Sequence, residues 1–209
     1  MPQIVIDASG RIIVAYSVFR DDDWNAQVLV STSHDGGQHF SAPRAIGANP
    51  ASQRFPALAL APDGALFVAW IDKRLVADAA KRGRKLKGAS IAYAWSDDAG
   101  TTFTVPAIAH AESCECCRIG AAIAAANRPV IAFRAVFDQR VRDHGVVQFN
   151  GRDAPGALQR IANDDWVTDA CPHHGTTPMA WRKDAYLNAQ RDRIVCSAHG
   201  AQFDIETGT

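Results

Sequence analysis

The chain has 209 residues, 47% of them apolar, which is enough for one large or two small globular domains. Its 22 Lys and Arg balance its 22 Asp and Glu, so no net charge draws in a nucleic acid or an acidic membrane. No stretch reaches the roughly 18 consecutive apolar residues that a membrane-spanning helix needs. We therefore expect neither a nucleic-acid partner nor a membrane partner.

The first residues carry no export signal, because Met1 is followed at once by a strand-like run rather than by a charged and then an apolar segment. If Met1 is the true start, we expect a cytoplasmic protein. If an upstream signal is missing, a secreted or periplasmic protein is expected instead, and the sequence leaves the compartment open.

Three copies of one unit follow in chain order, each an apolar run, a turn and a second apolar run. They are Pro2–Ser17, Pro56–Trp70 and Ile119–Phe133. The turns contain Ser9-Gly10 and Asp63-Gly64 in the first two copies, and Asn127 takes the equivalent place in the third. These residues favour left-handed turn conformations, so the pattern predicts three β-hairpins.

A second shared element with the pattern Ser-x-Asp-x-Gly-x-x-Phe follows two of these hairpins. Its members are Ser33, Asp35, Gly37, Phe40 and the later Pro43, then Ser96, Asp98, Gly100, Phe103 and the later Pro106. The Asp carboxylate is suited to accept turn N–H groups, and the Gly to adopt a conformation closed to other residues. We expect the Phe to plug the neighbouring core, so the element is a structural device and not a catalyst.

This motif resembles the Asp-box, or BNR repeat, of sialidase-like β-propellers, and the resemblance covers about residues 1–175. It implies an all-β fold in which the box closes a hairpin on the outer side of a four-stranded blade. The third unit departs from the pattern, since Phe149–Leu158 stands where a box is expected and lacks the Ser-x-Asp order. About three blades are too few for a closed ring of roughly four to eight, so we expect a partial propeller over residues 1–165.

The resemblance also implies the sialidase machinery: an arginine triad, a tyrosine nucleophile helped by a glutamate, and an acidic proton donor. Arg118 and Arg134 are of the residue type that binds carboxylates, but neither lies in a motif that matches the sialidase triad. The only Arg-x-Pro, Arg54–Pro56, follows the first box instead of preceding it. Tyr16 and Tyr93 lie in apolar strand runs, where packing is the better interpretation. Sialidase activity therefore ranks last among the function hypotheses.

Three cysteines crowd the segment Glu112–Gly120, at Cys114, Cys116 and Cys117. They are suited to a soft metal such as Cu(I) or zinc. The alternatives are a disulfide to Cys171 or inert buried thiols, and a structural use is favoured. The stretches "CECCR" and "DACPHHG" resemble a subgroup of bacterial BNR proteins, which adds no catalytic assignment.

The insert Asp72–Gly88 carries seven Lys or Arg in 17 residues. A patch for an anionic partner is one interpretation. A solvated loop is commoner for such charge runs, and is what we expect here.

The last 44 residues, 166–209, hold a Cys-x-His pair, Cys171 and His173, and a Cys-x-x-His pair, Cys196 and His199. A Rieske [2Fe-2S] centre needs two thiolates on one iron and two imidazoles on the other, one of each from two loops. The segment resembles a truncated Rieske ferredoxin-like protein, which implies that these four residues are the cluster ligands. Val146–Phe149 is a candidate strand before the first loop. Zinc is the rival metal for the same four residues.

The sequence thus predicts 2 iron, 2 sulfur cluster binding and electron transfer to a redox partner protein, with the cluster segment carried on a propeller fragment. The alternative is a non-catalytic propeller module that binds a glycan or a protein. An exo-sialidase-type glycoside hydrolase is the third hypothesis.

Overall fold

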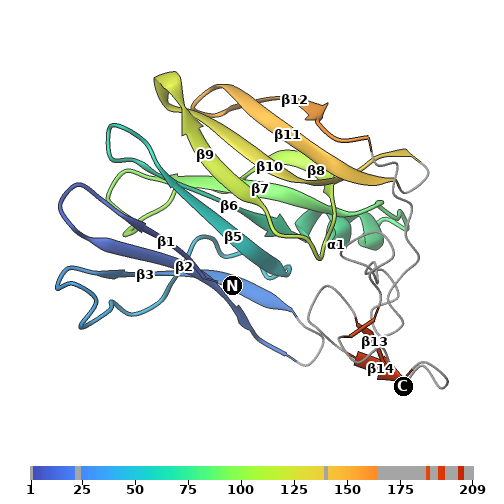
Figure 1. The fold of residues 1–209 in the computed structure, drawn as a ribbon, viewed down its shortest axis with the longest axis horizontal. Coiled ribbons are helices and arrows are strands. Elements are labelled where there is room, and N and C mark those ends of the chain that lie inside the picture. The colour runs from blue at the N-terminus through green and yellow to red at the C-terminus, as the bar shows by residue number, and fades with distance from the viewer. Residues whose placement is uncertain are drawn as a thin grey trace.

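Three four-stranded antiparallel units follow one another along the chain (Figure 1). The computed structural model describes residues 2–21, 25–138, 141–163, 187–188, 193–195 and 202–204. The first blade contains β1 (Gln3–Ile6), β2 (Ile12–Phe19), β3 (Ala26–Ser33) and β4 (Arg44–Ala45). The second contains β5 (Gln53–Leu60), β6 (Leu66–Asp72), β7 (Ala89–Ser96) and β8 (Ala107–Ser113). The third contains β9 (Gly120–Ala124), β10 (Arg128–Val136), β11 (Arg142–Gly151) and β12 (Ala154–Arg160).

Within each blade, consecutive strands pair in the order in which they occur along the chain. The second and third blades join into one sheet through a single pair, Ser113 of β8 with Ala135 of β10. No ring closes among the described residues, so the three blades form an arc. The expectation of an all-β fold with about three blades is confirmed at this level.

The three predicted hairpins form, and their turns have the predicted conformation. Gly10 and Gly64 have φ angles of 82° and 87° between β1 and β2 and between β5 and β6. Asn127 has φ 52° in the short 3-10 turn η1 (Ala125–Asn127) between β9 and β10. A positive φ is open to glycine at little cost and to asparagine more readily than to most other residues.

The second blade is buried on both faces, and its strands alternate between two cores. Along β6, Phe67, Ala69 and Ile71 face the third blade, whereas Leu66, Val68 and Trp70 belong to the core shared with the first blade. Side chains of a strand point alternately to its two faces, so burial on both sides requires the unbroken apolar run that β6 has. This explains why the most hydrophobic stretch of the sequence lies in the middle of the arc.

The two Asp-boxes connect β3 to β4 and β7 to β8, and each is closed by its own hydrogen bonds. In the second box, the Ser96 hydroxyl donates to Asp98 Oδ1 at 2.7 Å and accepts the Gly100 N–H at 2.7 Å. The Asp98 carboxylate also accepts the backbone N–H groups of Thr101 and Thr102, at 3.0 and 2.8 Å. The first box repeats the Ser-Asp and Gly-Ser bonds at 2.8 and 3.0 Å. The predicted role of the box as a structural device agrees with this geometry.

The predicted role of the box phenylalanines is right for one box and wrong for the other. Phe103 packs against the core between the first and second blades, whereas the Phe40 side chain is 48% exposed. The second box leans toward the first blade, as the approach of Gly100 to Val30 indicates. Among the described residues, Phe40 belongs to neither of the two core clusters.

In the third blade a tight turn stands where the first two blades have a box, and side chains of the second blade bond to this turn. β11 ends at Gly151 and β12 begins at Ala154. Trp95 Nε1 donates to the carbonyl of Arg152 at 3.1 Å, and the Tyr93 hydroxyl donates to the carbonyl of Asp153 at 3.3 Å. The Arg152 guanidinium lies over the Trp95 ring, 4.6 Å from its centroid. Aromatic side chains of β7 thus supply the hydrogen bonds that hold this turn, whereas each box is held by bonds within its own loop.

The insert after β6 contains a helix, α1 (Arg74–Lys81), where a solvated loop was expected. Asp72 accepts the Arg74 N–H at 2.8 Å and pairs with the Arg74 guanidinium at the start of this helix. Ala79 is buried against the blade. Charge alone suggested a loop, but the bonds of Asp72 to Arg74 at the first helical residue and a small apolar face stabilise a helix instead. No helix in the described part of the chain is long and apolar enough to cross a membrane.

The predicted boundary near residue 165 lies outside the described residues. Of the C-terminal segment, β13 (Arg193–Val195) and β14 (Gln202–Asp204) form an antiparallel pair. Val146–Phe149, a candidate strand for the Rieske segment, instead lies within β11 of the third blade, paired with β10. That assignment is therefore corrected, because its apolar residues Val147 and Phe149 are fully buried in the core between the second and third blades.

Candidate functional site

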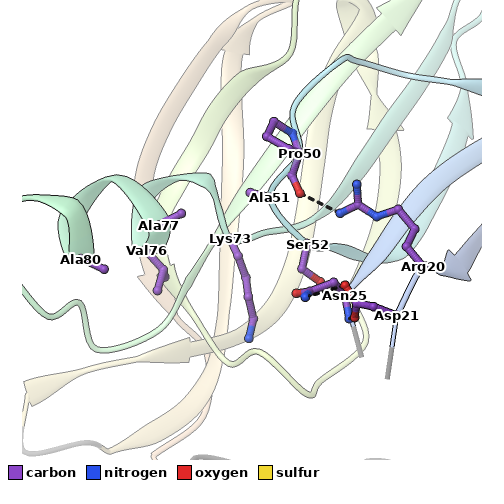
Figure 2. Close-up of a pocket in the computed structure, with 10 residues that line it drawn as sticks. All are labelled: Arg20, Asp21, Asn25, Pro50, Ala51, Ser52, Lys73, Val76, Ala77 and Ala80. Carbon is purple, nitrogen blue, oxygen red and sulfur yellow. Dashed lines mark hydrogen bonds between the residues drawn. The ribbon is translucent and has the colours of Figure 1, made fainter. Parts of the chain in front are cut away.

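A wide-mouthed cavity of about 410 Å³ lies between the first and second blades, beside α1 (Figure 2). Its wall combines hydrogen-bonding side chains from turns far apart in the sequence with small apolar side chains of the helix. The lining residues are Arg20, Asp21, Asn25, Pro50, Ala51, Ser52, Lys73, Val76, Ala77 and Ala80. The volume falls within the range of roughly 300 to 1,000 Å³ that is usual for small-molecule sites.

Hydrogen bonds fix the polar side chains of this cavity. Figure 2 shows the Arg20 guanidinium reaching the Pro50 carbonyl, at 2.7 Å. The Asn25 amide donates to Asp21 Oδ2 at 2.9 Å, and the Asn25 backbone N–H donates to Asp21 Oδ1 at 3.0 Å. Ser52 accepts the Ala26 N–H through its hydroxyl. The donors and acceptors are therefore held in place before any ligand arrives.

Lys73 links the cavity to the segment that follows β8. Its ammonium group lies 2.6 Å from Glu115 Oε2, and both side chains are about one quarter exposed. A pair at this depth is partly screened by water, so its main effect is to position the two groups. Glu115 stands between Cys114 and Cys116, which brings the cysteine cluster next to the cavity wall.

A strained residue occurs in the same region. Phe55 has φ 52° within a register irregularity of β5, and this conformation is unusual for a bulky residue. The neighbouring Arg54 is buried, and burial lowers the pKa of its guanidinium, while the carboxylates of Glu115 and Asp21 oppose this shift. The irregularity thus places a buried cation between the cavity and the cysteines.

The three cysteines of the segment Glu112–Gly120 lie together. Cys114 Sγ lies 3.2 Å from Cys116 Sγ and 3.1 Å from Cys117 Sγ, and the last two are 3.9 Å apart. All three are free thiols, and their sulfurs can reach a common metal ion. Cys114 is 1% exposed. The sequence indicated the cluster, and the structure brings all three sulfurs together.

Neighbouring groups shift the pKa values of the three thiols in opposite directions. S–H donation from Cys116 and then from Cys117, with the charge of Arg142, lowers the pKa of Cys114 well below its ordinary value. The same bond to Cys114 raises the pKa of Cys116, and raises that of Cys117 to about 12. A lowered pKa favours the thiolate, which is the form of cysteine that binds metals, so the direction of the shift at Cys114 is favourable for metal binding.

The two tyrosines considered for sialidase chemistry have other hydrogen-bond partners than the glutamate that such chemistry needs. Arg118 is exposed and lines a small cavity beside Phe55, whereas Arg134 Nη1 lies 3.8 Å from Cys117 Sγ. The Tyr16 hydroxyl bonds to Ser31 and the Tyr93 hydroxyl to the Asp153 carbonyl. Within the described ranges, neither tyrosine hydroxyl hydrogen-bonds to a glutamate. The packing interpretation of both tyrosines agrees with this.

The four predicted Rieske ligands, Cys171, His173, Cys196 and His199, lie outside the described residues. β13 and β14 flank the segment that contains Cys196 and His199 but do not extend to either residue. The [2Fe-2S] cluster and its zinc alternative at these residues stay predictions.

The cavity between the blades was missed by sequence reasoning. Arg20 directly follows β2, Ser52 directly precedes β5 and Lys73 directly follows β6. Only the tertiary fold brings these three residues together. One available signal was the helical spacing of Val76, Ala79 and Ala80, which the count of basic residues obscured.

No protein-family model and no curated protein matches the sequence. Solved structures do match its fold. The Hadza microbial sialidase Hz136 has a TM-score of 0.53 at 19% identity, covering 75% of this chain and 37% of its own. A protein of unknown function from Dyadobacter fermentans has a TM-score of 0.55 at 15% identity, covering 76% and 52%. A mutant of the NanB sialidase from Streptococcus pneumoniae has a TM-score of 0.50 at 16% identity, covering 76% and 22%.

The chain therefore spans about a fifth to a half of the length of these structures. At such low identity the likeness establishes the fold alone. It gives no support to a Rieske segment or to electron transfer. What it establishes is an all-β arc of blades with a sialidase-like fold.

Proposed function

We propose that this protein is a non-catalytic carbohydrate-binding module whose ligand occupies the cavity between the first and second blades. The observation that carries the proposal is which side chains form the wall of this cavity. Charged, amide and hydroxyl side chains converge from three connections between strands, opposite small apolar residues of α1. A sugar presents hydroxyl groups and a weakly apolar ring face, and it needs both kinds of contact.

Preorganisation supports the same proposal. Because Arg20, Asn25 and Ser52 are each already hydrogen-bonded to the protein, a ligand gains their remaining donors without the entropy cost of ordering them. Arg20 and Lys73 are cations and Asp21 is an anion, so the wall is suited to both hydroxyl and carboxylate groups of a sugar. The sialidase names of two structures with this fold agree with a carbohydrate ligand.

The test is binding of the purified protein to a printed panel of sialylated, sulfated and neutral oligosaccharides, followed by titration calorimetry on the best binder. We expect Arg20→Ala to weaken binding by about tenfold or more, since hydrogen bonds from a charged donor contribute about 1.5 to 3 kcal/mol. Hydrolysis of a fluorogenic sialoside by the wild type would contradict the non-catalytic part of the proposal.

Two control variants locate the site. Phe40 lines a second cavity of about 460 Å³ at the outer rim, together with residues of both boxes. If Phe40→Ala weakened binding while Arg20→Ala did not, the inter-blade cavity would be the wrong site. Lys85→Ala removes an exposed charge of the basic insert outside the cavity, and we expect it to bind like the wild type. An equal loss in this variant would mean that the insert acts as a simple charge patch.

A further inference from the structure

The cysteine triad lies outside the inter-blade cavity and has a geometry of its own. Three sulfurs within 3.1 to 3.9 Å of one another are closer than unrelated buried thiols need to be. We infer that Cys114, Cys116 and Cys117 form a three-thiolate site for one thiophilic cation, Cu(I) or Zn(II). This inference is independent of carbohydrate binding.

The sulfur triangle fits such an ion with little movement. A point equidistant from the three sulfurs lies about 2.0 Å from each, so a zinc ion with bonds of about 2.3 Å would sit about 1 Å above their plane. Tetrahedral zinc needs sulfurs about 3.8 Å apart. The separations of 3.1 and 3.2 Å therefore have to open by about 0.6 to 0.7 Å, which side-chain rotation supplies.

The backbone that carries the triad is anchored to two neighbouring strands. The Cys114 N–H donates to the carbonyl of Arg134 in β10 at 2.8 Å. The Ser113 hydroxyl donates to the carbonyl of Ala89 in β7 at 2.9 Å. An added Cβ at Gly88 would clash with the backbone carbonyl oxygen of Ser113, so the chains are in close contact there. The first ligand is thus fixed on the sheet, as a preformed site requires.

Positive charge surrounds the triad. Each cysteine has one arginine within electrostatic reach, and the arginines come from three different strands, β5, β10 and β11. The pairs are Cys114 with Arg142, Cys116 with Arg54, and Cys117 with Arg134. Three thiolates around Cu(I) carry a net charge of −2, and around Zn(II) a net charge of −1. Cations placed this way offset the charge that metal binding would leave in a poorly hydrated site.

The ligand set favours Cu(I) over Zn(II). Among the described residues, the group of metal-ligating side chains at this place contains the three cysteines and no histidine or carboxylate. Glu115 is turned to Lys73. Soft thiolates suit Cu(I), whereas protein zinc sites are almost always four-coordinate. We therefore expect Cu(I) to bind more tightly, and Zn(II) to bind with a solvent molecule completing its shell.

A disulfide is the competing use of the same residues. Cys114 and Cys117 have Cys-x-x-Cys spacing, which is typical of redox pairs. A redox pair requires two sulfurs, yet Cys116 lies as close to Cys114 as Cys117 does. The third sulfur is what a metal site needs and a disulfide does not.

The experiment uses the full chain, reduced and kept anaerobic. Cu(I) is titrated in competition with bicinchoninate and Zn(II) in competition with a chromophoric chelator, and X-ray absorption then counts sulfur neighbours. We expect one equivalent bound by three sulfurs, and a loss of affinity of about 100-fold or more in Cys116→Ser. Cys116 is only partly buried, so this variant spares the core better than a change at Cys114.

The matched control is the double variant Cys171→Ser with Cys196→Ser, which leaves the triad intact and is expected to keep the bound equivalent. Three results would overturn the inference: no metal bound by the wild type, fewer than three sulfurs around the ion, or a control that loses binding as completely as Cys116→Ser. Detection of a Cys114–Cys117 disulfide in anaerobically purified protein, by mass spectrometry after thiol labelling, would also overturn it.

Discussion

At the residue scale, the two box aspartates are held ionised by hydrogen bonds to their own loops. The backbone N–H of His39, and then its ring, lower the pKa of Asp35 to about 2. For Asp98, partial burial raises the pKa, but bonds from the backbone and hydroxyl of Thr102 and from Ser96 outweigh it and lower the pKa to about 2. A carboxylate that accepts several N–H and O–H groups favours its charged form.

The sign of the resulting pH dependence follows from these values. Because the folded-state pKa of Asp98 lies below the ordinary aspartate value of 3.8, its carboxylate stabilises the fold at pH values above about 4, and this contribution is lost as the pH falls from about 4 to about 2. We expect Asp98→Asn to lower the urea midpoint at pH 7 and to show a flatter decline below pH 4. Asp78→Asn, on the exposed surface of α1, should follow the wild type, and an identical curve for both variants would refute the assignment.

Gly100 carries two constraints that can be separated by a paired substitution. Its φ is 89°, and an added Cβ would lie 3.2 Å from Val30 Cγ1 of the first blade. Gly10 has φ 82° and nothing within 4 Å. We expect Gly10→Ala to cost about 1 kcal/mol from the backbone alone, and Gly100→Ala about 2 kcal/mol because contact with Val30 is added. If urea unfolding showed the same loss of unfolding free energy for both variants, the box would not press on the first blade.

At the scale of elements, α1 depends on one buried carboxylate. Asp72 is fully buried and accepts from the Trp70 indole at 2.9 Å and from the Arg74 N–H and guanidinium. We expect Asp72→Ala to reduce the free energy of unfolding by about 3 to 5 kcal/mol, because it leaves Arg74 without its buried partner. Amide hydrogen exchange of α1 should accelerate selectively. A variant with unchanged exchange in α1 would contradict the dependence of this helix on Asp72, and Lys81→Ala at the exposed end of the helix is the control.

Much of the fold could be predicted from sequence because its signals are local. A turn at Gly10 or Asn127 and a box closed by Ser96 and Asp98 involve residues a few positions apart, so the pattern contains the whole interaction. The helix α1 was missed because Asp72 acts from the preceding strand. The cysteine triad was visible as a motif, but no sequence pattern predicts that three arginines from distant strands surround it. The inter-blade cavity is likewise a product of tertiary packing.

At the scale of the whole molecule, the second blade couples its neighbours. Phe67 and Trp70 are both fully buried on β6 but face opposite cores. We expect Phe67→Ala and Trp70→Ala each to cost about 3 to 5 kcal/mol, and each to reduce hydrogen-exchange protection in all three blades together. The exposed Val105→Ala is the control. Loss of protection confined to the third blade in Phe67→Ala would mean that the blades unfold separately.

The corner between β11 and β12 has a practical consequence for anyone labelling this protein. The loops of the first two blades bond to themselves, and Gly36 at the tip of the first one has open space around it. A peptide tag or fluorophore spliced there should leave the sheets undisturbed. The same insertion between Arg152 and Asp153 would detach that corner from the indole and phenol of the adjacent blade. Attachment sites on this scaffold are therefore unequal, even where the loops have similar exposure.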